Sequence, residues 1–217
     1  MGQAGVDADD DITAFAHHCV YMRSVFLHEK ILFEESSAEA RRRMSAAAGT
    51  LFGDLNRILI EYIILQACRI TDPAKDIRGN DNLTIAFLLA RYDLNADQAK
   101  KKRVSDLAAS IDTFRKALLP ARHKRIAHAD RSAAHDVQSY GQATNAEWDK
   151  FWVELRELVS TIYQAVHGTP FDIDGGVMSD ADGLLKVLKG EACLQKLIGE
   201  SAQMGNKCLD TLQTIAD

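Results

Sequence analysis

The sequence has few residues that break helices or cross-link a chain. Only three prolines occur among its 217 residues. Because proline removes a backbone donor and clashes with the preceding turn, long helices meet few interruptions. The four cysteines show no Cys-x-x-Cys pairing, and no secretory signal segment begins the chain. These absences predict a cytoplasmic protein with reduced thiols.

The chain also lacks a long apolar run and an excess of positive charge. A membrane-spanning helix needs roughly 20 consecutive apolar residues, and the longest candidate, Ile58 to Ile70, contains Glu61, Gln66 and Arg69. No contact with a membrane is therefore expected. The net charge of −5 argues against a general nucleic-acid coat protein, which would be basic overall. A negative net charge is compatible with a local basic cleft, since an enzyme that binds RNA transiently needs only a small positive site.

What the sequence does contain favours helices. Hydrophobic residues make up 47% and charged residues 26% of the chain, an ordinary mixture for a globular protein. Almost nothing alternates at the two-residue period of a strand, whereas apolar residues recur at three- and four-residue steps. Helix starts are indicated where Ser, Thr or Asn is followed three residues later by Glu or Gln. These starts are Ser36, Asn95 and Thr144, with a weaker one at Ser179.

These signals predict an all-α protein, an antiparallel helical bundle with additional C-terminal helices. The expected helices are 11–35, 38–70, 83–92, one from residue 95 that Pro120 interrupts, one around 148–162, and one or two between 184 and 215. We expect a flexible N-terminus, the bundle itself, a connecting loop, and a C-terminal helical extension that packs on the same domain. Their predicted bounds are 1–10, 11–167, 168–180 and 181–217.

Three local expectations follow from the pattern. The second helix is predicted to be the most buried, with one apolar face at regular steps. That face consists of Leu51, Leu55, Ile58, Tyr62 and Leu65. Pro120 is expected either to kink its helix or to lie in the first turn of a new one. The C-terminal segment is expected to form one or two helices, with any break near Gly199 or Gly205.

One segment concentrates ionisable side chains beside small residues. Residues 121–130 read ARHKRIAHAD. A histidine, with an unperturbed pKa of about 6.5, suits proton transfer near neutral pH, and an arginine offers a planar donor fork that fits phosphate oxygens. Arg122 and His128 thus supply what metal-free RNA cleavage needs, namely proton transfer and stabilisation of charge on the phosphate. Alternatively, the pair lies on the surface, and His128 caps helix carbonyls or binds Asp130.

The segment resembles the Arg-x5-His motif of the HEPN superfamily. Arg122 is followed by the polar His123 and, after five intervening residues, by His128. The letters IAHAD match the form found in the abortive-infection-associated branch of HEPN proteins. The run RITDP at 69–73, followed by NLT at 82–84, is similar to the loop and helix start that precede the motif in that branch. The resemblance extends over roughly residues 10–165.

The resemblance implies a HEPN-like bundle that forms a homodimer, with the Arg–His pairs of two copies facing each other across a composite cleft. Active members resemble metal-independent endoribonucleases that leave a cyclic phosphate, and many serve as toxins or antiphage effectors. By this resemblance His128 would transfer the proton, Arg122 would clamp the phosphate and His123 would tune the site. Lys124 and Arg125 would support the site or bind substrate. No metal or other cofactor is expected, RNA is the expected substrate, and an antitoxin or defence protein is a candidate partner.

Asp130 departs from the family pattern. HEPN toxins paired with nucleotidyltransferase antitoxins often have a tyrosine two residues after the histidine, where this sequence has Asp130. The departure argues against regulation by adenylylation, and Asp130 could instead orient His128. Arg69 and Asp72 could pair locally and anchor their loop, or they could line the cleft.

Two alternatives to an enzyme stay open. The domain could be a non-catalytic dimeric module that binds RNA, a nucleotide or a partner protein, with the motif retained for structure. It could also be a purely structural helical adaptor, which a monomeric state in solution would favour.

Overall fold

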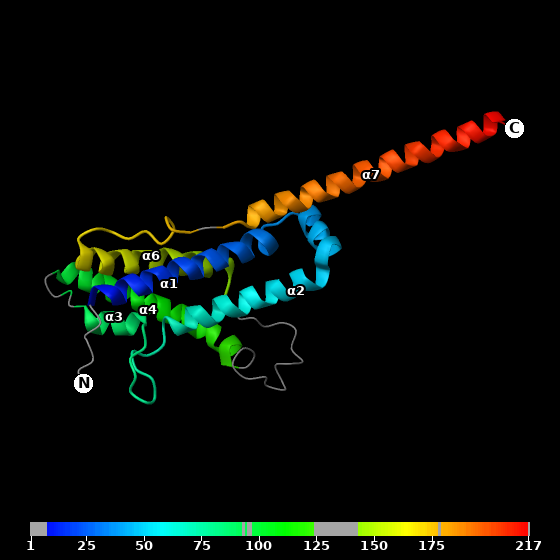
Figure 1. Ribbon diagram of the computed structural model, residues 1–217. Helices are drawn as coiled ribbons and strands as arrows, with labels where there is room; N and C mark the ends of the chain where they lie inside the picture. Colours follow the sequence, from blue (N-terminus) through cyan, green and yellow to red (C-terminus); the bar gives the residue numbers. More distant parts are fainter. Residues whose placement is uncertain (1–7, 93, 95–96, 124–142, 178, 217) are drawn as a thin grey trace, which may run out of the picture. The chain divides into compact units, whose positions relative to one another are not determined.

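The computed structural model describes residues 8–92, 94, 97–123, 143–177 and 179–216, with side chains for those between Asp11 and Gln203. Within these ranges the chain forms helices and no strand, apart from one isolated β-bridge between Lys75 and Asp81. The elements are α1 (Ala8–Glu29), the π-helix η1 (Lys30–Glu34), α2 (Ala38–Arg69), α3 (Ile85–Arg91), α4 (Gln98–Ala121), α6 (Asn145–His167) and α7 (Ala181–Ala216) (Figure 1). The all-α prediction is confirmed.

Side-chain caps determine where two of these helices begin. At the start of α6 the Glu147 backbone N–H donates to the Thr144 hydroxyl, and the Thr144 N–H donates to the Glu147 carboxylate. This is the reciprocal capping box predicted from the sequence. At α4 the cap is Asp97, whose carboxylate accepts from the Lys100 N–H at 3.0 Å. The helix therefore begins at Gln98, three residues after the predicted start at Asn95.

The chain forms two compact units. The first comprises residues 1–26 and 57–178, and the second comprises residues 27–56 and 179–217. Since the boundaries fall inside α1 and α2, each of these helices contributes to both units.

The first unit is built around α4 and α6, which pack along each other. Phe26 of α1 lies against α6, with its ring centroid 5.6 Å from that of Trp148 and 5.3 Å from that of Trp152. Figure 1 shows α1 and α4 each running along α6. The completely buried side chains of this unit include Ile12, Phe15, Met22, Ile64, Leu107, Ile111, Phe151, Leu155 and Leu158. This core fixes the position of α4, whose C-terminal end carries the start of the motif.

The second unit has a smaller apolar cluster of its own. Its buried members are Leu32, Met44 and Ala181, and partly buried side chains pack against them. Those neighbours are Ile31, Phe33, Phe52, Leu55, Leu185 and Leu188. The first turns of α7 are therefore attached to η1 and to the first half of α2.

The predicted buried face of α2 was wrong in part. Leu51 and Ile58 are 65% and 55% exposed, although both lie on the expected apolar stripe. The reason is that α2 bends at Ala48 and is divided between the two units, so no single face is buried along its whole length. The second half contributes a different set to the core of the first unit. That set is Ile63, Ile64, Ala67 and Cys68.

Pro120 lies inside α4 close to its end, and the C-terminal segment is one helix. α4 continues through Pro120 and ends at Ala121, so Pro120 does not begin a new helix. A proline in the last turn removes only one intrahelical hydrogen bond, which limits its cost. α7 runs from Ala181 to Ala216 without a break at Gly199 or Gly205.

Among the helices that the structure describes, none combines the length and apolar character needed to cross a membrane.

Candidate functional site

The first residues of the Arg-x5-His segment lie at the C-terminal end of α4. Leu118 and Ala121 are buried there. The backbone remains helical at Arg122, whose N–H donates to the carbonyls of Leu118 and Leu119. Arg122 is therefore held by the same turn that anchors the helix in the core, while the next residue, His123, is exposed. Lys124, Arg125, His128 and Asp130 lie outside the described residues.

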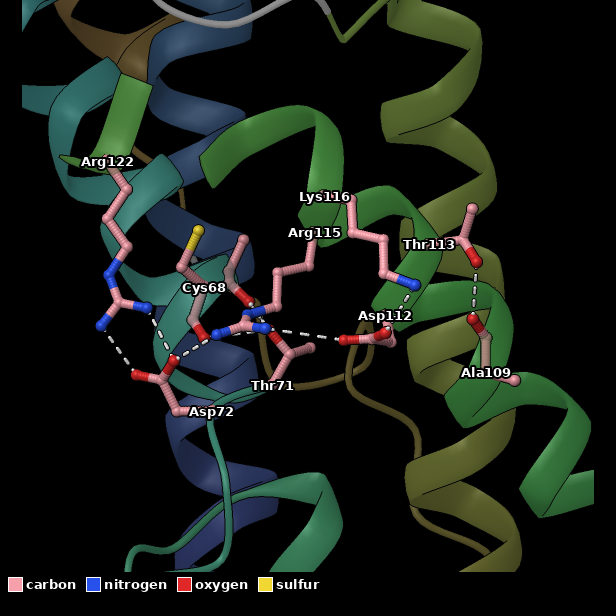
Figure 2. Close-up of polar contacts among 10 residues, drawn as sticks. Cys68, Thr71, Asp72, Ala109, Asp112, Thr113, Arg115, Lys116 and Arg122 are labelled. Atoms are coloured by element: carbon pink, nitrogen blue, oxygen red, sulfur yellow. Dashed lines mark hydrogen bonds and ion pairs between the residues drawn. The ribbon is translucent and has the colours of Figure 1, made fainter. Parts of the chain in front are cut away.

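The guanidinium of Arg122 binds the carboxylate of Asp72 through both of its terminal nitrogens. Nη1 donates to Oδ1 at 2.6 Å and Nη2 donates to Oδ2 at 2.8 Å. The two side chains are 20% and 21% exposed. Two parallel, charge-assisted hydrogen bonds of this kind fix direction as well as distance. Arg122 is thus held in one orientation, as Figure 2 shows.

A second arginine of α4 reaches the same carboxylate. Arg115 lies seven residues, two helical turns, before Arg122 and so shares its face of the helix. Its Nη2 donates to Oδ1 of Asp72 at 2.8 Å, and its Nη1 lies 3.7 Å from Oδ1 of Asp112. Asp72 therefore bridges two cations that would otherwise repel each other along one helix face (Figure 2).

The turn that follows α2 places Asp72 where both arginines can reach it. Ile70 is 1% exposed and fixes the turn to the core. The Thr71 hydroxyl lies 2.9 Å from the carbonyl oxygens of Ala67 and Cys68, to which it donates. The backbone N–H of Asp72 donates to the carbonyl of Arg69 at 3.1 Å. Backbone and side-chain hydrogen bonds thus set the direction of this carboxylate before the arginines bind it.

The whole cluster falls inside a span that a known family shares. The HEPN_AbiU2 family model, described as AbiU2, matches residues 7–184. The chain belongs to the AbiU2 family. This is an abortive-infection-associated family of the HEPN superfamily, so the resemblance drawn from the motif is confirmed. No curated protein and no solved structure matches the chain. The match ends within the first turn of α7, whose remaining length lies outside it.

The charges of Asp72, Arg115 and Arg122 stabilise one another. Burial alone would raise the pKa of Asp72, but hydrogen bonds from Arg122 and Arg115, with their positive charges, outweigh it and hold the pKa below its ordinary value. The same contact raises the pKa of Arg122. Asp72 is therefore ionised at neutral pH, and Arg122 keeps its charge and further N–H donors beyond the two that bind Asp72.

The structure brings some of the predicted site residues together and adds one. Asp72 binds Arg122, a contact that the sequence did not predict, and Arg69 lines a cavity with Asp72. The hydrogen bonds of the Asp72 carboxylate come from Arg122 and Arg115, and the contact between Arg69 and Asp72 is the backbone hydrogen bond of the turn. Arg115 was missed by sequence reasoning, although its spacing from Arg122 placed both on one helix face. Within the described ranges no three His, Cys, Asp or Glu side chains lie close enough together to hold a metal ion.

The charge of Asp72 can be tested through its effect on stability. Asp72→Asn is expected to lower the free energy of unfolding by about 1–2 kcal/mol at neutral pH, since charge-assisted hydrogen bonds to two arginines weaken. A carboxyl whose folded pKa lies below its ordinary value of 3.8 stabilises the fold above that value and loses this effect as pH falls through the folded pKa. The difference between parent and variant should therefore shrink below about pH 4.

Urea denaturation of both proteins from neutral to acidic pH measures this difference. Asp81→Asn is the matched control, because Asp81 is 60% exposed and pairs only with Lys75 on the same loop. Its effect should stay within about 0.5 kcal/mol at every pH. A parent–variant difference for Asp72 that is independent of pH would show that the charge contributes nothing.

Proposed function

We propose that this AbiU2-family chain is a metal-independent endoribonuclease that acts on RNA in the cytoplasm, in phage defence or as a toxin-like effector. One observation carries the proposal. Arg122, the first residue of the Arg-x5-His motif, stands at the end of a well-packed helix with its guanidinium oriented by Asp72. Orienting a donor fork in advance is the main way a protein stabilises charge that develops on a phosphate.

In the proposed reaction the 2′-oxygen of a ribose attacks the adjacent phosphorus. The O2′–P bond forms, the P–O5′ bond breaks, and the proton of the 2′-hydroxyl is balanced by one delivered to the leaving 5′-oxygen. His128 transfers a proton in this exchange, and Arg122 stabilises the charge on the non-bridging oxygens. The products are a 2′,3′-cyclic phosphate and a 5′-hydroxyl.

The proposed enzyme is a homodimer, because the site needs an Arg–His pair from each of two copies. A neutralising antitoxin or a defence protein that triggers cleavage is the proposed partner. His123, Lys124, Arg125 and Asp130 would then support the site or contact the RNA. The dimer, the partner and these roles come from the family resemblance.

The test is cleavage of RNA without metal ions. Purified protein is incubated with total RNA in the presence of EDTA, and the new ends are mapped chemically. We expect 2′,3′-cyclic phosphate and 5′-hydroxyl termini, which follow from attack by the 2′-oxygen. Intact RNA, or 3′-hydroxyl ends produced by a metal-activated water, would contradict the proposal.

A specific observation favours the non-catalytic alternative as the second candidate. The donor fork of Arg122 is already bound to a carboxylate, and Arg115 binds the same group. In that case the arginine serves to attach the turn after α2 to the end of α4, and the domain is a dimeric module for RNA or a partner protein. Variants of the two arginines separate these functions, as argued in the Discussion.

A further inference from the structure

A cavity of about 290 Å³ lies between α1, the end of α2 and the segment that leads into α3. Its apolar lining includes Phe15 and Ile70. Its polar lining consists of His18, Arg69, Asp72, Asn82 and Thr84. The volume is at the lower limit for small-molecule pockets, roughly 300–1,000 Å³. A single nucleotide unit is therefore a better match for this space than a larger ligand.

This cavity shares a wall with the proposed catalytic cluster. Asp72 lines it and at the same time binds Arg122 and Arg115. A group bound in the cavity would thus lie on the other side of one carboxylate from the motif arginine. That placement suits the part of an RNA strand next to the bond to be cleaved.

The charge around this wall is positive. Among the described residues, this wall and the cluster behind it contain three arginines, Arg69, Arg115 and Arg122, and two carboxylates, Asp72 and Asp112. Arg115 and Arg122 are bound to Asp72, whereas Arg69 is exposed and makes no ion pair with any residue that the structure describes. An exposed guanidinium in the lining of a cavity, without an ion pair among the described residues, favours an anionic ligand, and its planar fork fits phosphate oxygens.

A second cavity of about 470 Å³ provides a comparison within the same unit. Its lining includes Arg156 and Glu157 of α6. Arg156 is paired with Asp174 at 3.0 Å, and Glu157 is paired with Arg103 at 2.6 Å. Its arginine is thus paired with a carboxylate, and its lining also carries the Asp172 carboxylate, so the larger cavity has no comparable preference for an anion.

His18 and Asn82 give the smaller cavity neutral hydrogen-bonding groups. Burial lowers the pKa of His18 and the charge of Arg69 lowers it further, while the side chain of Gln66 opposes the shift. His18 is therefore neutral near pH 7, with one nitrogen that donates and one that accepts. The Asn82 amide nitrogen donates to the Pro73 carbonyl at 3.1 Å, which leaves its oxygen as an acceptor. Groups of this kind can bind a base or a ribose.

We propose that this cavity binds one nucleotide of single-stranded RNA beside the scissile phosphate, with Arg69 on the phosphodiester and His18 and Asn82 on the base or ribose. The inference rests on the proposed function, since it assigns a substrate subsite to the same enzyme. Arg69 acts here in binding and takes no part in proton transfer.

The test uses a probe that cannot be cleaved. A short, fluorescently labelled, fully 2′-O-methylated single-stranded oligonucleotide lacks the attacking hydroxyl, so its anisotropy reports binding alone. Arg69→Ala is expected to raise the Kd about tenfold and to reduce the dependence of log Kd on log salt by about 0.7–1, the effect of one lost phosphate contact on a single strand. His18→Gln should raise the Kd a few-fold, with an unchanged salt dependence.

Arg78→Ala is the matched control, because it removes the same charge from an exposed position outside the cavity, on the loop that follows Arg69. Its Kd should stay within about twofold of the parent. Circular dichroism and thermal melting establish that each variant is folded. A parent protein that fails to bind the probe, or an Arg69→Ala variant that binds as tightly as the parent or no more weakly than Arg78→Ala, would overturn the inference.

The outcome is separable from that of the proposed function. If the parent cleaves RNA but Arg69→Ala binds the probe normally, the ribonuclease proposal stands and the subsite is wrong. If Arg69→Ala weakens binding but the parent never cleaves RNA, the subsite stands, and it belongs to the RNA-binding module that is the second candidate.

Discussion

Replacing His128 by alanine is expected to lower the rate of RNA cleavage by about 10²–10⁴-fold, the usual contribution of a general acid or base. Cleavage by the 2′-oxygen requires removal of one proton and delivery of another. Alanine can do neither, while the phosphate-binding groups remain. The loss should therefore appear in the rate of the chemical step, measured by the appearance of cyclic phosphate ends in EDTA under single-turnover conditions.

His28→Ala is the matched control for this experiment. His28 lies in the last turn of α1, and the same purification of both variants reveals any contaminating ribonuclease. We expect parent-like cleavage by His28→Ala and the same helical content in all three proteins by far-ultraviolet circular dichroism. Equal cleavage by His128→Ala and the parent would eliminate His128 from the mechanism.

The helices could be predicted from the sequence because helix caps and apolar spacing depend on residues close together in the chain. The capping box of Thr144 and Glu147 and the apolar spacing of the following helix depend on neighbouring residues alone. α6 accordingly starts where the sequence indicates. For Pro120 the sequence left open a kink or a new helix start, because the effect of proline depends on its position in the helix. In the last turn the helix loses one hydrogen bond and then ends at Ala121.

The burial of α2 could not be predicted, because it depends on which partners each part of the helix meets. Leu51 and Ile58 fit an apolar stripe, yet both are more than half exposed. The helix passes from one compact unit to the other between Asn56 and Arg57. Periodicity identifies an amphipathic helix, but it carries no information on a change of neighbours along its length.

The candidate site was found only in part for a related reason. Arg122 entered the prediction through its chemistry and the motif, and Asp72 through the similar loop, as separate features of the sequence. Their pairing spans 50 residues of sequence, and the contact between Arg115 and Asp72 spans 43. Such contacts arise from the packing of α4 in the core. Sequence spacing could show that the two arginines share a helix face, but not what that face meets.

The strongest test of what Arg122 does is its comparison with Arg115. Both bind Oδ1 of Asp72 from the same helix face, and both are 20% exposed. Replacing either one by alanine removes charge-assisted hydrogen bonds to the same carboxylate and should lower the free energy of unfolding by about 1–3 kcal/mol. Both variants therefore perturb the same carboxylate, although Arg122 makes two hydrogen bonds to it and Arg115 makes one, and only Arg122 belongs to the Arg-x5-His motif.

If Arg122 stabilises charge on the scissile phosphate, Arg122→Ala should reduce cleavage by about 10²–10³-fold, as expected for loss of a preorganised donor. Arg115→Ala should stay within a few-fold of the parent once urea denaturation has shown that both variants are folded under the assay conditions. Arg122→Lys should recover little activity, because an ammonium group keeps the charge but lacks the fork. Equal losses in Arg122→Ala and Arg115→Ala would instead assign the pair to structure. The arginine of the motif would then serve to hold the turn after α2 against α4, and the domain would be the non-catalytic module.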